Sequence, residues 1–396
     1  MKKIYVLGIA ASLMFQFSCK KKADPAPVDS TAATQKLIIE NYSNIVYATY
    51  DDSWLALKNL KTAASAFTST PSEGGLKAVR EAYIAARTPY IQSEAFRFYA
   101  GPIDDDRGLE GLINSWPLDE SYIDYIENDA NTGLVNDVAG FPTITKELIA
   151  DNNQTAGEES VSCGFHAVEF LLWGQDLSVD GPGNRPYTDY VTGGAGTNKN
   201  QERRAAYLLA CIDLLIDNLN TLRQDWSSSV ANNYRAKFVA SPSGSIANFL
   251  TGAFRYADGE LSVERMQVAL DAEEDAERQE NEQSCFSDQT HMDIILGQKG
   301  IRNVYVGEYT RTDGSTVKGM SLSILVTSKN PLTGANALAK ISNATAKVAA
   351  IHPPFDNEIV LSNPAGRTRV QDAINALHEE AAQYQAAGAA LGLIIN

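Results

Sequence analysis

The sequence predicts an all-α protein made of two related helical-bundle domains, with a small β hairpin in the second domain. Apolar residues recur every three or four positions along most of the chain, which is the period of an amphipathic helix. One segment alternates as a hairpin does, and two passages with Ser-Cys ahead of a histidine echo each other, as a duplicated bundle would leave them. The 396 residues are enough for two domains.

The first half is expected to consist of helices joined by long loops. Leu37, Ile38, Tyr42 and Ile45 share one helical face, and the Ser/Thr/Pro/Gly-rich run over residues 69–75 ends that helix. We expect helices over residues 34–67, 76–99 and 203–226 and a short helix ending at Ile149, with irregular structure over residues 100–120 and 177–199.

The second half shows the same helical period, with one interruption. Val304, Val306 and Tyr309 alternate ahead of Asp313-Gly314, a dipeptide typical of a tight turn, so a β hairpin is expected over residues 303–318. We expect helices over residues 243–256, 263–282, 320–326, 335–349 and 367–392.

The N-terminus carries the features of an export signal. Lys2 and Lys3 precede an apolar run that is too short to span a bilayer, and Ser18-Cys19 after it resembles the lipobox of bacterial lipoproteins, whose cysteine is acylated. The alternative is an ordinary secretory signal in which Cys19 is incidental. The predicted parts are a signal peptide (1–18), a lipid-anchored flexible tether (19–34), a first domain (35–230) and a second domain (231–396). The expected location is therefore the cell envelope, on an outer membrane facing the periplasm or the surface.

The net charge of the chain limits the classes of partner that it can bind. The chain has 33 Lys and Arg against 49 Asp and Glu, a net charge of −16, which repels phosphate backbones and argues against nucleic acid. Such a surface is compatible with cations.

Apart from Cys19, the cysteines are Cys163, Cys211 and Cys285. A disulfide between Cys163 and Cys285 and buried free thiols are both compatible with an envelope protein.

The motif Gly164-x-His166-x-x-Glu169 is the strongest chemical signal in the chain, which has only four histidines. Residues three apart on a helix project from one face, so an imidazole nitrogen and a carboxylate oxygen can reach a single divalent ion. The simpler alternative is a hydrogen-bonded pair on a helix. In the echoing passage, Asp288 lies three residues before His291 and shares its face if that segment is helical. If the two halves pack together, all four side chains can converge on one ion.

The motif and the apolar residues after it resemble the signature of the imelysin family. Further similar blocks occur in the family's order over nearly all of the mature chain, at residues 93–98, 101–104, 114–119, 181–187 and 284–288. The resemblance implies two helical-bundle domains with a site in the cleft between them. It also implies an envelope protein linked to iron acquisition, in a family that carries a metallopeptidase label and includes proteins called iron-regulated protein A.

The residues of these blocks are the candidate site. Metal ligation is expected at His166 and Glu169, with further candidate ligands at Glu94, Asp104, Asp288 and His291. Several of these have simpler explanations, such as an ion pair of Glu94 with Arg97 or a solvated turn at Asp104. The residues expected to line the cleft are Ser93, Arg97, Asn114, Trp116, Asp119, Tyr187 and Ser287.

Two functional classes follow. The first is an envelope protein that binds a divalent metal ion (iron or zinc) or a metal-bridged small ligand, working with envelope components of iron transport. The second is a zinc-dependent peptidase, in which Glu169 or Glu94 would be the general base. A peptidase needs three protein ligands, an open position on the metal and a separate base. The sequence identifies neither a third ligand nor the base, which favours binding.

Overall fold

Helices make up nearly all the regular structure in residues 30–395, the part of the chain that the computed structural model describes. The all-α fold class is confirmed, because a single two-stranded hairpin is the only sheet in these residues. The predicted signal peptide (1–18) and the predicted lipidation site Cys19 lie outside the described residues. The predicted tether (19–34) is wrong from Ser30 onward, where the first helix already begins.

The first half contains three long helices and several short ones. Its elements are α1 (Ser30–Ser69), α2 (Glu73–Gln92), the 3-10 helix η1 (Ser93–Phe96), α3 (Leu109–Ile113), α4 (Glu120–Ile123), α5 (Gly133–Asn136), α6 (Lys146–Asn152), α7 (Gly164–Trp173), the 3-10 helix η2 (Tyr187–Tyr190) and α8 (Gln201–Asp225). The Ser72 side chain accepts a hydrogen bond from Gly75 N and so caps α2, which begins earlier and ends earlier than the predicted helix over 76–99.

The second half contains α9 (Tyr234–Ala240), α10 (Pro242–Arg255), the π-helical segment η3 (Tyr256–Gln267), α11 (Val268–Asp271), α12 (Asp275–Glu280), α13 (Thr290–Val306), β1 (Glu308–Thr310), β2 (Thr316–Lys318), α14 (Leu322–Lys329), α15 (Pro331–Val348), α16 (Phe355–Ile359) and α17 (Pro364–Ala390). The strands are antiparallel, with Tyr309 opposite Val317. The hairpin is thus shorter than predicted, because residues 303–306 belong to α13. The predicted helix over 263–282 is wrong as one element, since the chain turns out of helix at Ala272.

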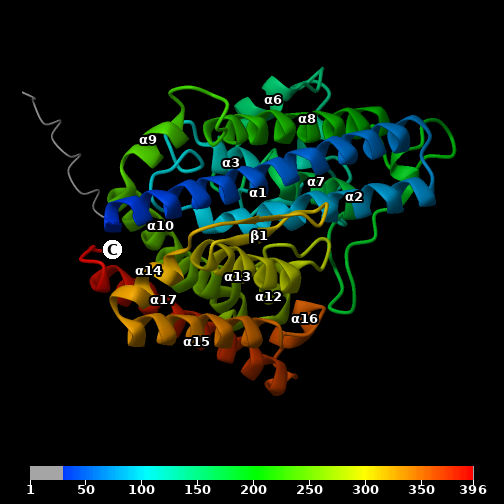
Figure 1. The fold of residues 1–396 in the computed structure, drawn as a ribbon. Helices are drawn as coiled ribbons and strands as arrows, with labels where there is room; N and C mark the ends of the chain where they lie inside the picture. Colours follow the sequence, from blue (N-terminus) through cyan, green and yellow to red (C-terminus); the bar gives the residue numbers. More distant parts are fainter. Residues whose placement is uncertain (1–29, 396) are drawn as a thin grey trace, which may run out of the picture.

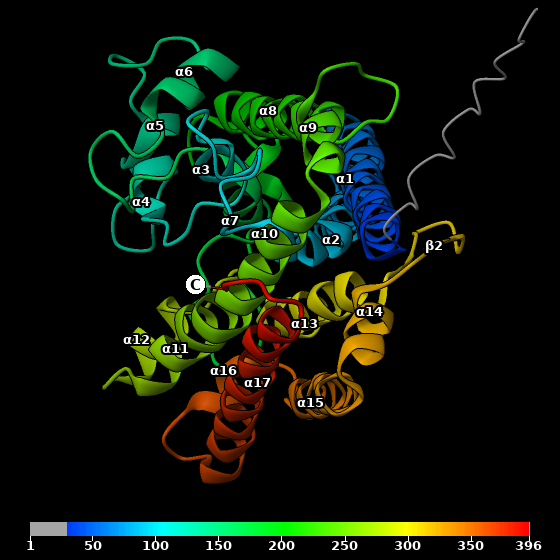
Figure 2. The same ribbon diagram turned by 60° about the vertical axis from the view of Figure 1, so that its left-hand side comes forward.

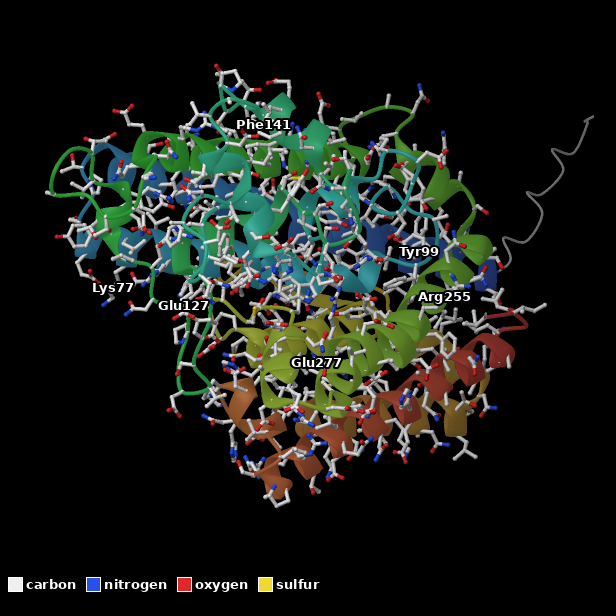
Figure 3. All side chains as sticks on the ribbon, turned by 180° about the vertical axis from the view of Figure 1, so that it is seen from behind. Lys77, Tyr99, Glu127, Phe141, Arg255 and Glu277 are labelled. Carbon is white, nitrogen blue, oxygen red and sulfur yellow. The ribbon has the colours of Figure 1, made fainter. Side chains whose placement is uncertain are left out.

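The two halves of the chain lie largely in two parts of the molecule. Helices α1, α2, α7 and α8 lie together above α13, α15 and α17 (Figures 1 and 2). Seen from behind, side chains of both parts meet along the boundary, with Glu127 on the upper side and Glu277 on the lower (Figure 3). The contact of α2 with α13 crosses this boundary. The division into two related domains stays a prediction.

Helix α8 illustrates how the core is built. Its side chains Leu208, Leu215 and Leu222 are fully buried, each stabilising the fold by roughly 2 kcal/mol. Helix α8 packs against α1 and α7. By length and composition, α8 is also the one described helix that would suit a membrane span.

Candidate functional site

Helix α7 carries the His-x-x-Glu motif and is buried along its whole length. Gly164 begins the helix with a φ of 92°, and a Cβ atom there would lie 2.7 Å from the carbonyl oxygen of Ile113. Glycine meets both conditions without strain. His166 and Glu169 lie on one face of the helix, as predicted, with His166 Nδ1 3.1 Å from Glu169 Oε2.

The Glu169 carboxylate is held by donors from three directions. Its Oε2 also accepts from the Tyr83 hydroxyl at 3.2 Å, and its Oε1 accepts from the amide and the hydroxyl of Ser287 at 3.1 and 2.5 Å. Burial raises the pKa of Glu169, while Arg87 and the hydrogen bonds from Ser287 lower it. The carboxylate is therefore a hub of hydrogen bonds that joins α2, α7 and the loop before α13.

The His166 imidazole is neutral. Burial and the nearby Arg87 guanidinium hold its pKa well below the usual range. A neutral ring can donate from Nδ1 to Glu169 and accept at Nε2 from Arg87 Nη2, which lies 3.5 Å away. With both nitrogens engaged and a cation beside one of them, the pair forms part of a hydrogen-bonded junction. Ligation of a metal by His166 and Glu169 stays a prediction.

Arg87 and Asp293 form the centre of this junction. Arg87 Nε and Nη2 donate to Asp293 Oδ2 at 3.0 and 2.7 Å, and Nη1 donates to Asn114 Oδ1 at 3.0 Å. Ser284 adds a hydroxyl hydrogen bond of 2.7 Å to the same Asp293 oxygen. The ion pair is nearly inaccessible to solvent, with side-chain exposures of 3% and 5%. It crosses from α2 to α13 and so links the two halves.

Neither Arg87 nor Asp293 was among the candidate residues. A signal for Arg87 does exist: it stands in the apolar stripe that Val79, Tyr83 and Tyr90 form on α2, and a charge in such a stripe needs a buried partner. Asp293 stands two residues after His291 and so does not share a helical face with it, and its carboxylate accepts from Arg87 instead.

The candidates near η1 form a separate ionic cluster. Glu94 pairs with Arg97 at 2.8 Å, as the simpler explanation had it, and Arg97 also lies within 4 Å of Asp104, Glu110 and Glu260. Asp104 accepts from the Phe98 amide at 2.6 Å. Ser93 donates its hydroxyl to the Tyr90 carbonyl oxygen.

An acidic pocket of about 280 Å³ lies beside the junction. Trp116 lines it and packs its ring 4.9 Å from the ring of His166. Asp119 also lines it, whereas Tyr187, in η2, does not. The pocket is lined by Trp116, Pro117, Leu118, Asp119, Glu120, Glu159, Asp176, Gln279, Glu280, Asn281 and Cys285.

The predicted pairing of Asp288 with His291 on one helical face is wrong. Asp288 has a φ of 55° and precedes α13, which begins at Thr290. Within residues 30–395, the one group of three or more acidic, histidine or cysteine side chains whose ligand atoms lie within metal-binding reach is Asp176, Asp288 and Asp356. The convergence of His166, Glu169, Asp288 and His291 on one ion is therefore not formed.

Of the two predicted states of the cysteines, a disulfide or free thiols, the structure has the free thiols. Cys163, Cys211 and Cys285 are buried free thiols, so no disulfide joins Cys163 to Cys285. Burial raises the pKa of all three thiols, which leaves them protonated and unreactive at neutral pH.

Comparison with known proteins identifies the family. The family model of imelysin matches residues 46–384, most of the chain. The chain belongs to the imelysin family. Iron-regulated protein A of Synechococcus elongatus is 26% identical over 129 residues, a match that spans 33% of this imelysin-family chain and 29% of that protein.

Two solved structures share the fold. A protein named as an iron-regulated protein A precursor, from Parabacteroides distasonis, superposes with a TM-score of 0.69 at 17% identity and covers 92% of this chain and 97% of its own. An imelysin-like protein from Psychrobacter arcticum gives a TM-score of 0.64 at 14% identity, covering 92% and 98%. At these identities the likeness establishes the fold of this imelysin-family protein alone.

Proposed function

We propose that this imelysin-family protein is a binding protein of the cell envelope that takes up a divalent metal ion, iron first, or a small ligand bridged by one. The family assignment and the name of the matched relative, iron-regulated protein A, support an iron-related role. The lipobox-like Ser18-Cys19 supports a lipid anchor at Cys19 and an envelope location, where iron-transport components would be its partners.

The observation that carries the proposal is the composition of the acidic pocket beside Trp116. Five carboxyl groups line it and none of its lining residues is basic. Residues from both halves of the chain contribute, including Asp119 from the first and Glu280 from the second. Carboxylates gathered in a partly enclosed space concentrate cations, and about 280 Å³ accommodates a hydrated ion or a small chelate.

The alternative, a zinc-dependent peptidase of the imelysin type, finds less support. Its base would be Glu169 or Glu94, but these side chains are 0% and 2% exposed and neither lines the pocket. A general base must reach a metal-bound water and the substrate. A carboxylate that already accepts hydrogen bonds from Tyr83 and Ser287 in a sealed junction has no access to either.

Titration calorimetry of the purified chain with Fe²⁺ under anaerobic conditions, Zn²⁺ and ferric citrate tests the proposal. We expect saturable binding of at least one of them, weakened more than about tenfold in Asp119→Asn/Glu280→Gln. The asparagine keeps the cap that Asp119 provides for Ser121 N. Asp180→Asn, an exposed change on the neighbouring loop, is the matched control. Absence of binding by the unsubstituted chain would contradict the proposal.

A broad peptide-cleavage assay decides the alternative. Cleavage by the unsubstituted protein that disappears in His166→Ala, in protein shown to be folded, would replace the binding function with the peptidase. Fractionation of cells that express Cys19→Ser tests the anchor: release of this variant from the membrane fraction is expected.

A further inference from the structure

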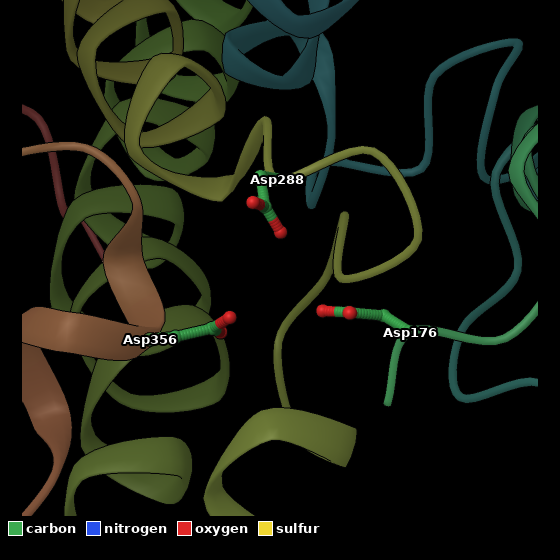
Figure 4. A group of neighbouring side chains, drawn as sticks. All are labelled: Asp176, Asp288 and Asp356. Carbon is green, nitrogen blue, oxygen red and sulfur yellow. The ribbon is translucent and has the colours of Figure 1, made fainter. Parts of the chain in front are cut away.

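Three carboxylates from distant parts of the chain meet below the junction. Asp176 lies in the loop after α7, Asp288 in the loop before α13 and Asp356 in α16. One oxygen from each lies within 4.8 Å of the others, and Figure 4 shows the three side chains pointing toward a common centre. Like charges at such distances repel, so the arrangement needs a compensating group.

Among the described residues, no basic side chain compensates these three carboxylates. Asp288 Oδ1 accepts no hydrogen bond among the described residues, although Asp288 is only 8% exposed. Asp356, only 2% exposed, contacts Glu282, and burial together with a hydrogen bond shared between the two carboxyl groups raises the pKa of Glu282 well above its usual range. Other buried carboxylates of this fold behave differently: Asp293 pairs with Arg87 and Asp124 with Arg204. A buried carboxylate without partners costs several kcal/mol.

Two compensating groups are available to such a cluster, protons and a cation. Burial and mutual repulsion raise the pKa of Asp288 to about 7 and that of Asp176 to about 6. A proton joins only two carboxyl groups at a time, as between Glu282 and Asp356. A cation at the centre would satisfy one oxygen of each aspartate at once.

Two features already orient the ligands. Gln279 Nε2 donates to Asp176 Oδ2 at 2.6 Å, and the Ser178 amide donates to its Oδ1 at 3.2 Å. Ser287, next to Asp288, is fixed by its two hydrogen bonds to Glu169. Ligands held by such outer contacts bind metals more tightly than free side chains do.

We propose that Asp176, Asp288 and Asp356 form a binding site for a hard divalent cation of the Ca²⁺, Mg²⁺ or Mn²⁺ type, completed by water, that ties α16 and the loops after α7 and before α13 together. The donor set is oxygen only, which is the set these ions prefer, and it lacks the nitrogen and sulfur ligands of zinc sites. The His166–Glu169 pair then acts as a positioning group, because it holds Ser287 and thereby Asp288. Asp176 also lines the pocket beside Trp116, whereas Asp288 and Asp356 do not, so variants at those two residues test this site separately from the function proposed for the pocket.

Thermal unfolding of the full purified chain, stripped with EDTA, tests the site. We expect a saturable rise of Tm on addition of Ca²⁺, Mg²⁺ or Mn²⁺. Electron paramagnetic resonance should show that each chain binds one Mn²⁺ ion. Asp288→Asn and Asp356→Asn should each weaken the apparent affinity more than about tenfold. Their metal-free Tm should equal or exceed that of the unsubstituted protein, since each removes repulsion within the cluster.

The controls separate this site from the pocket. Asp180→Asn and Asp119→Asn/Glu280→Gln should keep the cation-dependent rise, even if the latter loses iron binding. A Tm that rises when the pH is lowered but ignores all three cations would overturn the proposal in favour of a protonated cluster. Unchanged Mn²⁺ affinity in both asparagine variants would also overturn it. If one variant fails to fold, the other and the Mn²⁺ titration of the unsubstituted chain still decide.

Discussion

Ser287 donates both its amide N–H and its hydroxyl to the same oxygen of Glu169, over 3.1 and 2.5 Å. The two residues are 118 positions apart, so these bonds join α7 to the loop that leads into α13. The signature glutamate therefore organises the contact between the two halves of the chain, and its other oxygen holds Tyr83 and His166.

Replacing Glu169 by glutamine tests this role. The amide has one acceptor oxygen where the carboxylate has two, so an NH₂ group must face a donor of Ser287, Tyr83 or His166. We expect the free energy of unfolding in metal-free buffer to fall by about 2–4 kcal/mol. Urea unfolding followed by circular dichroism measures it. A variant that lost bound metal at unchanged metal-free stability would show instead that Glu169 is a ligand.

Ser287→Ala is the milder change at the other end of the same contact. It removes the hydroxyl hydrogen bond and keeps the amide, so we expect a loss of about 1 kcal/mol. Because Asp288 follows directly, the cation-dependent rise of Tm should need a few-fold more Ca²⁺ or Mn²⁺. A stability loss without any change in cation response would separate the junction from the aspartate site.

Gly164→Ala tests why the motif begins with glycine. The alanine must adopt a φ of 92° and places its Cβ against the Ile113 carbonyl oxygen. We expect the free energy of unfolding to fall by about 2 kcal/mol or more. The matched control is Gly157→Ala, where a Cβ meets no atom within 4 Å. Equal effects of the two changes, measured by urea unfolding, would show that the φ at residue 164 is unimportant.

The helical period was enough to predict α1, α8 and α17 to within a few residues, because each has one buried stripe. It failed where burial overrides local pattern. Val304 and Tyr305 are buried with α13 and continue that helix, although Val304, Val306 and Tyr309 alternate as a strand would. The prediction of one helix over 263–282 was wrong because neither the π-helical segment η3 nor the turn at Ala272 has a periodic signature in the sequence.

The candidate site was predicted in part for a related reason. His166 and Glu169 are three residues apart, so their contact follows from helix geometry alone. Arg87 and Asp293 are 206 positions apart, and their contact follows only from how α2 packs on α13. Asp176, Asp288 and Asp356 come from three separate segments, and no spacing in the sequence brings them together.

Breaking the ion pair between Arg87 and Asp293 should strongly destabilise the folded protein. Arg87→Met leaves the Asp293 carboxylate buried with only Ser284 as a remaining donor, and we expect a loss of about 3–5 kcal/mol. Combining Arg87→Met with Asp293→Leu removes both charges and should restore part of that loss, so a double-mutant cycle should give a coupling above about 1 kcal/mol. The exposed i,i+4 pair of Lys77 with Glu81 supplies the control: Lys77→Met should leave urea unfolding unchanged. Additive effects of Arg87→Met and Asp293→Leu would contradict the role of the pair.

Glu380 should make the stability of the fold depend on pH. It is buried on α17, where Gln298 donates to one oxygen at 2.7 Å and the Tyr384 hydroxyl donates to the other, and burial raises its pKa to about 7. The folded protein therefore holds a proton that the unfolded chain releases near pH 4.5, so stability is highest below that pH and falls as the pH rises toward 7. The loss of stability approaches about 3 kcal/mol.

Glu380→Gln keeps a neutral group of the same shape, which can accept from Gln298 and donate to Tyr384. Urea unfolding between pH 4.5 and 8 should therefore show a smaller slope in this variant, whereas the exposed neighbour change Glu379→Gln should leave the slope as it is. Equal slopes in all three proteins would mean that folding does not raise the pKa of Glu380.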